Sequence, residues 1–467
     1  MAFTSIAFLF FFLPIFLAVY FAAPGIGAKN LITLLASLLF YAWGEPGFVP
    51  VLAASILVNG IAARGIEALE GTARRVALAL TVAADLLLLG VYKYTGFALG
   101  TLAALLAPLG LTVPVPTIAL PLGISFFTFH CLSYVIDVHR RRFPANRNPV
   151  QVALYIALFP QLIAGPIVRY GTVARQLQRR RHTLARAAIG MRIFIIGLAQ
   201  KVLIADLVAP LADAVFDRTA APGLADSWLG TLAYTMQIYF DFSGYSNMAV
   251  GLGIMLGFTL PRNFRLPYTS LSITGFWRRW HMSLSRWLRD YLYIPLGGSR
   301  GRARQTWRNL ITVFVLCGLW HGANWTFVLW GAWHGAFLVI ERAGLGRNLA
   351  RLPVLLRWVY AMLVVMGGWV LFRARDFGGA ARLYGGLLGL GGTARLGFEA
   401  HLALNTLSAG ALIVGSVLAV APRVMPRLPL APSAALLANT AWALALLLLS
   451  ALFVAAGTYS PFLYFRF

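Results

Sequence analysis

Residues 5–23 read Ser5-Ile-Ala-Phe-Leu-Phe-Phe-Phe-Leu-Pro-Ile-Phe-Leu-Ala-Val-Tyr-Phe-Ala-Ala23, a run without a single charged side chain. A helix needs about 20 predominantly apolar residues to cross the hydrocarbon core of a bilayer. This run is long for the apolar core of a signal peptide, and no basic segment precedes it. We therefore expect residues 5–23 to form a membrane helix rather than a cleaved leader.

Apolar runs of this kind recur to the end of the chain and predict an all-α, polytopic membrane protein with about 11 to 12 transmembrane helices. Of the 467 residues, 60% are hydrophobic and only 11% are charged, whereas a soluble domain carries about 25% charged residues. The candidate spans are 5–23, 30–43, 48–64, 76–93, 118–138, 187–207, 228–257, 324–341, 355–373, 403–421 and 434–454. We expect a single membrane-embedded domain over residues 1–467.

Two further apolar segments do not fit a simple crossing. Residues 309–320 are too short to span alone, and residues 150–168 are interrupted by Pro160 and Pro166. Broken segments of this kind are tolerated at membrane depth where protein or a water-filled cavity satisfies their backbone groups. We expect 150–168 to be re-entrant and 309–320 to count as a crossing.

Basic residues are distributed unevenly, and this pattern predicts the orientation. The chain has 39 Lys plus Arg against 14 Asp plus Glu, a net charge of +25. In a soluble protein that balance would suggest nucleic acid, but in a membrane protein cytoplasmic loops collect basic residues. The loops 169–192 and 262–308 hold seven and ten arginines, whereas 213–226 holds three aspartates and one arginine. We place the first two in the cytoplasm, and 213–226 and both termini outside.

His321 lies in Cys317-Gly-Leu-Trp-His-Gly-Ala-Asn-Trp325, inside an otherwise apolar stretch. An ionisable residue at membrane depth is a functional-site hypothesis by default. Gly318 and Gly322 flank it and would let a substrate or another backbone approach. The alternative is a histidine hydrogen-bonded to a backbone carbonyl. His334 would lie about 140° away on a continuous helix, so we interpret it as a packing residue.

His281 lies in a second unusual stretch, which the spacing predicts to be an amphipathic helix over 277–291 suited to the membrane boundary. One stripe of that helix would carry Trp277, Trp280, His281, Leu284, Leu288 and Tyr291. The opposite face would carry Arg278, Arg279, Arg286 and Arg289. From this position alone, a structural role for His281 is the simpler interpretation. The sequence contains no metal-ligand spacing. Cys131 and Cys317 both lie in apolar runs, and neither indicates a disulfide framework.

Four stretches of the chain carry a recognisable pattern: Gln237-Ile-Tyr-Phe-Asp-Phe-Ser-Gly-Tyr245, Phe276-Trp-Arg-Arg-Trp-His-Met-Ser-Leu-Ser285, Trp287-Leu-Arg-Asp-Tyr-Leu-Tyr-Ile-Pro-Leu-Gly-Gly298 and Gly318-Leu-Trp-His-Gly322. In this order they resemble the membrane-bound O-acyltransferase family, in particular the bacterial branch that acetylates alginate or transfers D-alanine to teichoic acid. The resemblance is densest over about 230–340 and extends loosely to 121–125, 159–166 and the aromatic chain end.

The resemblance implies transfer of an acyl group to a hydroxyl in the bacterial inner membrane. It places the family's catalytic histidine at His321 and its second functional histidine at His281. It implies a cytoplasmic thioester donor such as acetyl-CoA, no permanently bound cofactor, and an exported polysaccharide such as alginate as destination. A periplasmic partner protein would complete the transfer. A D-alanyl transferase of the same family and a transporter without acyl chemistry are the alternatives.

Two further expectations follow for the site and the chain end. Arg278 and Arg279 could attract the phosphates of coenzyme A, although topology and lipid headgroups account for most of the arginines. His321 would act as a base on the acceptor hydroxyl, with a covalent acyl-histidine as the alternative. After the helix 434–454, the aromatic segment 458–467 would lie outside and dock the periplasmic partner or, alternatively, anchor that helix at the lipid headgroups.

The predicted orientation can be tested by cysteine labelling. A cysteine introduced at Ser299, in the Arg-rich loop 262–308, should stay unlabelled when intact cells are treated with a membrane-impermeant maleimide. One introduced at Ala225, in the acidic loop, should be labelled. Labelling of the Ser299 position from outside intact cells would contradict the orientation.

Overall fold

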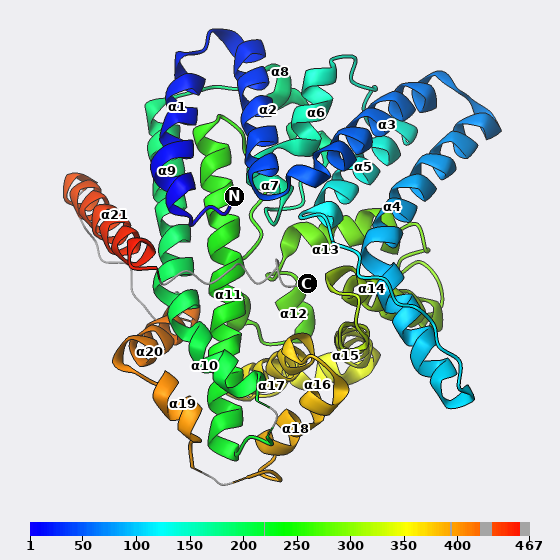
Figure 1. The fold of residues 1–467 in the computed structure, drawn as a ribbon. Helices are drawn as coiled ribbons and strands as arrows, with labels where there is room; N and C mark the ends of the chain where they lie inside the picture. The colour runs from blue at the N-terminus through cyan, green and yellow to red at the C-terminus, as the bar shows by residue number, and fades with distance from the viewer. Residues whose placement is uncertain (219, 393–394, 421–431, 458–467) are drawn as a thin grey trace. The chain divides into compact units, whose positions relative to one another are not determined.

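The structure is a computed structural model, and it describes the chain except for residues 219, 393–394, 421–431 and 458–467 (Figure 1). The segment 458–467, expected to dock a partner, therefore lies outside the described residues. Within the described residues every regular element is a helix. The predicted all-α class is thereby confirmed.

The chain divides into two compact units. One comprises Met1–Phe194 with Met248–Pro261, and the other comprises Ile195–Asn247 with Arg262–Phe467. The long helices α9 (Leu184–Ala199) and α11 (Leu224–Met255) each contribute residues to both units. The single domain expected over 1–467 stays a prediction.

The first unit is built around α5, whose residues are almost all buried. Helices α3 and α4 pack on α5, and α2 packs on α6 (Figure 1). The helix over 150–168 is interrupted at Leu158, and helical structure stops before Pro166, as the two prolines predict. The elements are η1 (Ala7–Phe12), α1 (Leu13–Ala22), α2 (Gly25–Gly44), η2 (Pro46–Phe48), α3 (Val49–Ala68), α4 (Gly71–Leu106), η3 (Ala107–Leu109), α5 (Ile124–His139), α6 (Pro149–Ala157), α7 (Phe159–Leu162) and α8 (Tyr170–Gln178).

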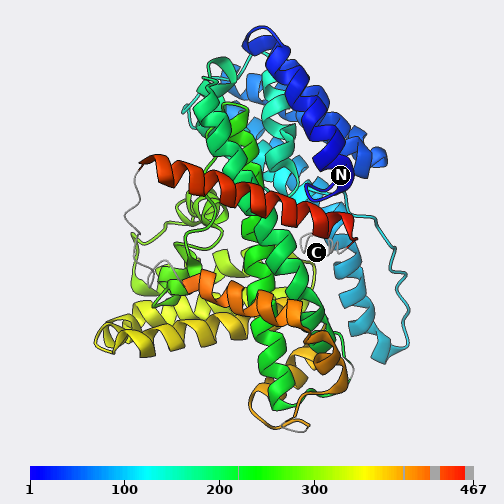
Figure 2. The same ribbon diagram turned by 90° about the vertical axis from the view of Figure 1, so that its left-hand side faces the viewer.

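The second unit contains the stretches that carry the family resemblance. Its helices α20 and α21, orange and red in Figure 2, both pack on the π-helical turn η4. The elements are η4 (Gln200–Ala205), α10 (Asp206–Phe216), η5 (Pro267–Thr269), α12 (Ile273–Trp277), α13 (Met282–Leu288), η6 (Arg289–Tyr293), α14 (Ala303–His321), α15 (Trp325–Ile340), η7 (Glu341–Leu345), α16 (Gly346–Ala350), α17 (Val354–Arg373), α18 (Phe377–Leu387), α19 (Phe398–Ala403), α20 (Thr406–Val420) and α21 (Pro432–Ala455).

Six helical segments among the described residues are long and apolar enough to cross a membrane, and two shorter apolar helices lie at 7–22 and 406–420. This is fewer than the 11 to 12 spans predicted. The run 118–138 is one that is too short, because its helix begins only at Ile124, after a stretch containing Pro114, Pro116 and Pro121. The six are Gly25–Gly44, Pro46–Ala68, Gly71–Leu109, Leu184–Phe216, Val354–Arg373 and Ala438–Ala455.

Glycines allow α14 and α15 to pack backbone against backbone. A β-carbon on Gly318 would lie 2.1 Å from the carbonyl oxygen of Phe327, and one on Gly331 would lie 2.2 Å from that of Phe314. Small residues permit such close approach between helices in membranes. Gly318, three residues before His321, therefore allows the backbone of α15 to approach α14. Approach of another backbone was one of the two possibilities predicted for this glycine, the other being approach of a substrate.

We expect Gly331→Ala to lower the thermal stability of the purified protein in detergent, because the added methyl group has no room. Overpacking of this kind costs about 1–3 kcal/mol. The matched control is Gly410→Ala in α20, where an added β-carbon meets nothing within 4 Å and where alanine is the better helix former. Equal melting temperatures for the two variants would contradict the close contact.

Candidate active site

His321 is the last residue of α14, where the chain leaves the helix with an extended Gly322. Its side chain is only 4% exposed. Three aromatic rings surround the imidazole, with centroids at 4.9 Å for Trp320, 5.1 Å for Trp330 and 5.3 Å for Phe372. The end of the helix thus places an ionisable group inside an aromatic enclosure.

His281 is held in an unusual backbone conformation. It has φ +41° and ψ +53°, in the left-handed region, and it immediately precedes α13. Non-glycine residues seldom adopt this conformation, which costs of order 1–3 kcal/mol and persists where the surroundings enforce it. The predicted continuous helix over 277–291 is therefore wrong, because a right-handed helix cannot pass through this residue. Helix α12 ends at Trp277 and α13 starts at Met282.

Hydrogen bonds to Asn263 define the protonation of His281. The Oδ1 atom of Asn263 accepts from the backbone N–H of Ser283 at 3.1 Å and from its hydroxyl at 2.9 Å. Since a backbone N–H can only donate, the atom that it meets must be the amide oxygen. The Nδ1 atom of His281, 3.1 Å from the same oxygen, must therefore carry a proton and donate it. In the neutral ring, Nε2 is then a bare acceptor.

The Nε2 atom of His281 is buried and has no hydrogen-bond partner among the described residues. Burial lowers the pKa of His281 to about 3, so the imidazole is neutral at physiological pH. A buried acceptor without a partner costs free energy, and a catalytic role or a bound water or ion are among the explanations for such a group. This atom is therefore a candidate contact for a substrate.

The two histidines come together, although 40 residues separate them in the sequence. Their ring centroids are 6.3 Å apart, which lets both imidazoles reach one bound group. The ring of Phe242, from the stretch 237–245, meets His281 edge-on at 4.7 Å. Three of the four stretches that carry the family resemblance thus converge at one place.

His334 is fully buried, and neither ring nitrogen has a hydrogen-bond partner among the described residues. It belongs to α15, separated from α14 by a turn, so the angle expected on one continuous helix does not apply. Trp330 lies between the two imidazoles, at 5.2 Å from His334 and 5.1 Å from His321. The packing role predicted for His334 stays a prediction.

Glu341 fixes the segment that leads to His281. Its carboxylate accepts from the backbone N–H groups of Ile273 at 2.6 Å and Thr274 at 2.9 Å, and also from the Thr274 hydroxyl. These N–H groups belong to the first turn of α12, where a negative charge is favourable. The carboxylate at the end of α15 therefore ties α12 to the α14–α15 hairpin.

A buried ion cluster lies in the same unit. The Nζ atom of Lys201 contacts Asp206 at 2.5 Å and Asp241 at 2.7 Å, and all three side chains are at most 4% exposed. Lys201 lies in the π-helical turn η4, an irregularity often found at functional sites. Asp241 belongs to the stretch 237–245, whose Phe242 touches His281. The cluster thus joins the α9–α10 segment to the helix that lines the site.

The two arginines predicted to contact the donor differ in their surroundings. Arg278 is exposed, whereas Arg279 is half-buried and donates to the hydroxyl of Thr269 at 2.8 Å. Arg279 is therefore already engaged in holding the loop. A donor-binding role for the pair stays a prediction.

Sequence reasoning missed Asn263, Glu341 and the Lys201–Asp206 pair. A signal was available for Lys201, because it is a charged residue inside the apolar run 187–207. Asn263 and Glu341 gave no such signal, since polar residues at the ends of apolar runs are common. Only the folded chain brings them to α12 and α13.

Comparison with known proteins gives a family match and several relatives that are all named for transfer of acyl or acetyl groups to oxygen. A family model described as MBOAT, membrane-bound O-acyltransferase family, matches residues 113–371. A probable alginate O-acetylase of Pseudomonas aeruginosa is 43% identical over the whole of both chains, and one of Azotobacter vinelandii is 48% identical over 84% of this chain and 79% of its own. A peptidoglycan O-acetyltransferase of Helicobacter pylori is 36% identical over 86% of this chain and 83% of its own.

The family model covers the α5 region, the histidine segments and the α14–α15 hairpin, and the relatives match most of the chain or all of it. The chain therefore belongs to the membrane-bound O-acyltransferase family.

Proposed function

We propose that this O-acyltransferase takes an acetyl group from a cytoplasmic thioester, acetyl-CoA or a close analogue, and passes it across the bacterial inner membrane for O-acetylation of an exported polysaccharide such as alginate. Relatives matching at least 84% of the chain at 43% and 48% identity bear the name probable alginate O-acetylase. Their names support acetyl as the acyl group and a polysaccharide as its destination.

One observation carries the chemical part of the proposal. The buried imidazoles of His281 and His321 lie 6.3 Å apart, and the Nε2 atom of His281 is an unoccupied acceptor among the described residues. Acyl transfer to a hydroxyl needs a base for the hydroxyl proton and a group that orients the reactants. Two histidines with different surroundings can divide these tasks.

His321 is the proposed base. It takes the proton of the acceptor hydroxyl as the oxygen attacks the thioester carbonyl carbon. The carbon–sulfur bond then breaks, and the thiolate of coenzyme A receives the proton from His321. The atoms balance as ester plus thiol, with the histidine regenerated. The surrounding rings of Trp320, Trp330 and Phe372 exclude water, which limits hydrolysis of the thioester.

His281 is the proposed orienting residue. A pKa of about 3 makes its imidazole a poor proton acceptor at neutral pH, because a general base works best with a pKa near the operating pH. Its Nε2 lone pair can still accept a hydrogen bond from a substrate N–H or O–H. Asn263 keeps that lone pair available by holding the proton on Nδ1.

The membrane arrangement completes the proposal. The exposed Arg278 and the half-buried Arg279 would attract the phosphates of the donor from the cytoplasmic side. A periplasmic partner protein would accept or complete the transfer on the other side. The alternative of a D-alanyl transferase has less support, because the relatives matching most of the chain bear acetylase or acetyltransferase names. Family membership also favours acyl chemistry over a transporter.

We expect His321→Ala to lower the rate of acyl transfer by about 10²–10⁴-fold, the usual contribution of a general base. The measurement is release of coenzyme A from acetyl-CoA by the purified protein in detergent, with an acceptor alcohol present. His401→Ala is the matched control, because His401 is an exposed histidine of the same unit. Turnover at the wild-type rate in His321→Ala would remove this residue from the chemistry.

We expect His281→Ala to lower kcat/KM by roughly tenfold to a hundredfold, since it deletes a hydrogen bond rather than the base. Asn263→Ala should lower it in the same direction but less, because the ring stays while its tautomer and the hydrogen bonds from Ser283 are released. Asn348→Ala, at an exposed position, serves as control. Unchanged kcat/KM in both site variants would return the pair to a structural role.

A further inference from the structure

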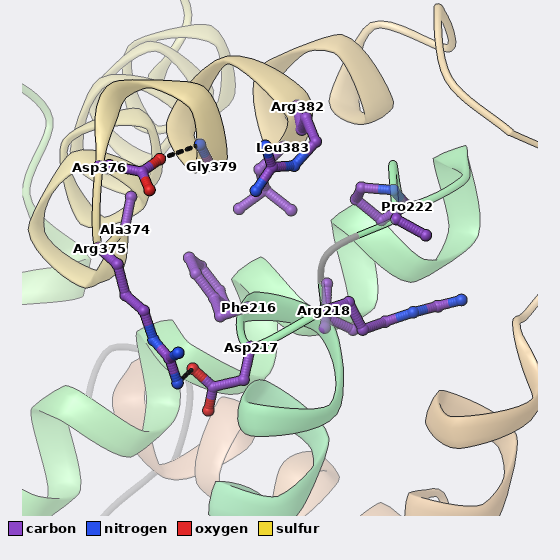
Figure 3. A pocket seen from close by; sticks show the side chains of 12 residues that line it. Phe216, Asp217, Arg218, Pro222, Ala374, Arg375, Asp376, Gly379, Arg382 and Leu383 are labelled. Atoms are coloured by element: carbon purple, nitrogen blue, oxygen red, sulfur yellow. Dashed lines mark hydrogen bonds and ion pairs between the residues drawn. The ribbon is translucent and has the colours of Figure 1, made fainter.

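Arginines line pockets in both units, but the surroundings of these arginines differ. In the second unit, the pocket between the end of α10 and the start of α18 also contains Asp217 and Asp376 (Figure 3). There Asp217 accepts a hydrogen bond from Arg375 at 2.9 Å, and Asp376 caps α18 by accepting from the backbone N–H of Gly379 at 2.6 Å. Acidic side chains therefore offset much of the positive charge in this pocket.

A pocket of about 590 Å³ in the first unit has no acidic side chain among the described residues that line it. Its lining comes from the first turn of α2, the end of α8, the segment before α9 and the turn after α11. Four arginines contribute to it, namely Arg179, Arg180, Arg181 and Arg186. A hollow lined by charges of one sign concentrates the opposite charge, so this pocket favours an anionic ligand.

Two of the four arginines hold the pocket together. The Nε atom of Arg180 donates to the carbonyl oxygen of Leu256 at 2.9 Å, and a terminal nitrogen of the same guanidinium donates to Oδ1 of Asn30 at 2.6 Å. The guanidinium of Arg186 donates to the carbonyl oxygen of Gly257 at 3.2 Å. These bonds tie the lining of the pocket to α2 and to the chain just after α11.

The other two arginines are unpaired. Arg179 and Arg181 are exposed, and their guanidinium groups form no hydrogen bond or ion pair within the part of the chain that the structure describes. Burial lowers the pKa of the adjoining His182, and nearby cations, Arg180 foremost, lower it further. The start of α9 at Leu184 adds the partial positive charge of a helix N-terminus. The two free guanidinium groups therefore lie in an uncompensated positive field, and their planar shape matches phosphate oxygens.

The pocket also lies where membrane-spanning segments begin. Ile26, in its lining, belongs to the first turn of the segment 25–44, which is long and apolar enough to cross a membrane. Another such segment begins at Leu184, whose side chain is 91% exposed. The exposed ring of Phe21 meets the ring of His182 with centroids 6.3 Å apart. Basic groups with apolar neighbours at the ends of spans match the two parts of a phospholipid.

We propose that this pocket binds the headgroup phosphate of an anionic phospholipid, with Arg179 and Arg181 pairing with its oxygens and the acyl chains lying against the exposed side chains of Phe21 and Leu184. Basic pockets between membrane helices on the cytoplasmic side bind anionic headgroups in other proteins. The arginines belong to the loop 169–192, which the charge pattern places in the cytoplasm. The inference goes beyond the acyl transfer proposed above and does not rest on it.

A soluble phosphate compound is the other source of the same chemistry. Such a compound would gain nothing from the exposed apolar side chains of Phe21 and Leu184, whereas a lipid would bury part of its chains against them. A lipid is also confined to the bilayer at the depth of the pocket, which raises its effective concentration there. The position of the arginines at the start of two spans therefore favours the lipid.

Lipid binding to the purified, delipidated full chain in detergent tests the proposal. Native mass spectrometry measures the binding of phosphatidylglycerol, and zwitterionic phosphatidylcholine with the same acyl chains is the reference. We expect one phosphatidylglycerol molecule to bind more tightly than any phosphatidylcholine, and to raise the melting temperature of the chain. Combining Arg179→Gln with Arg181→Gln should raise the Kd of this lipid by roughly tenfold or more, the usual effect of losing charge-assisted hydrogen bonds.

A second double variant controls for net charge. Combining Arg300→Gln with Arg304→Gln removes two exposed arginines from the other Arg-rich loop, 262–308. The total charge of the chain changes by the same amount in both variants. If the lipid binds in the pocket, this control should leave the Kd of the tightly bound phosphatidylglycerol unchanged.

Several results would overturn the proposal. These are equal affinity for the two lipids, an equal loss of affinity in the two double variants, or an unchanged Kd in the variant of Arg179 and Arg181. Displacement of the bound lipid by millimolar inorganic phosphate or by coenzyme A would instead assign the pocket to a soluble phosphate compound. Neither measurement uses acetyl-CoA turnover, so failure of the proposed enzyme function would be detected separately.

Discussion

Where α14 passes α15, carbonyl oxygens fill the space that β-carbons would occupy at Gly318 and Gly331. The arrangement of the site depends on this contact. It brings Trp330 against His321, and it sets the end of α15, where Glu341 holds the first turn of α12. Through α12 the contact also determines where His281 lies. A loosened hairpin would therefore separate the two histidines without altering either of them.

The aromatic enclosure and the hydrogen bonds of Asn263 have complementary effects. The rings lower the local dielectric and so strengthen every polar contact within the site. Asn263, through one oxygen atom, orients the His281 ring and the first turn of α13 together. Strain at the left-handed backbone of His281 is thus offset by hydrogen bonds formed by its immediate neighbours. A reactive arrangement is held ready before any substrate binds.

The sequence was sufficient to predict the all-α membrane class, the family resemblance and the two histidines that meet, because long apolar runs and long ordered motifs are strong local signals. It was insufficient for the geometry of 277–291, where hydrophobic periodicity indicated one helix. The period was compatible with a helix, but nothing in the pattern reports the left-handed conformation of His281 or its hydrogen bond to Asn263, which lies 18 residues earlier. Glu341 was missed for the same reason, since its partners lie 67 and 68 residues away. Apolar composition also does not reveal where prolines delay a helix, as they do before Ile124.

The ion cluster at Lys201 bears on how the chain enters the membrane during synthesis. A lysine at the centre of an inserting helix is unfavourable by about 2.5–3.5 kcal/mol on scales measured at the translocon. Lys201 and Asp206 belong to one continuous helical segment, 184–216, so the two charges can neutralise each other before α11 has been made. Asp241 is part of α11 and is synthesised later, and its contact with Lys201 links α11 to the segment 184–216. Because Lys201 and Asp206 are close in the chain, they can enter the bilayer as a neutral pair during synthesis. Asp241, which is made later, then binds Lys201 and so attaches α11 to this segment.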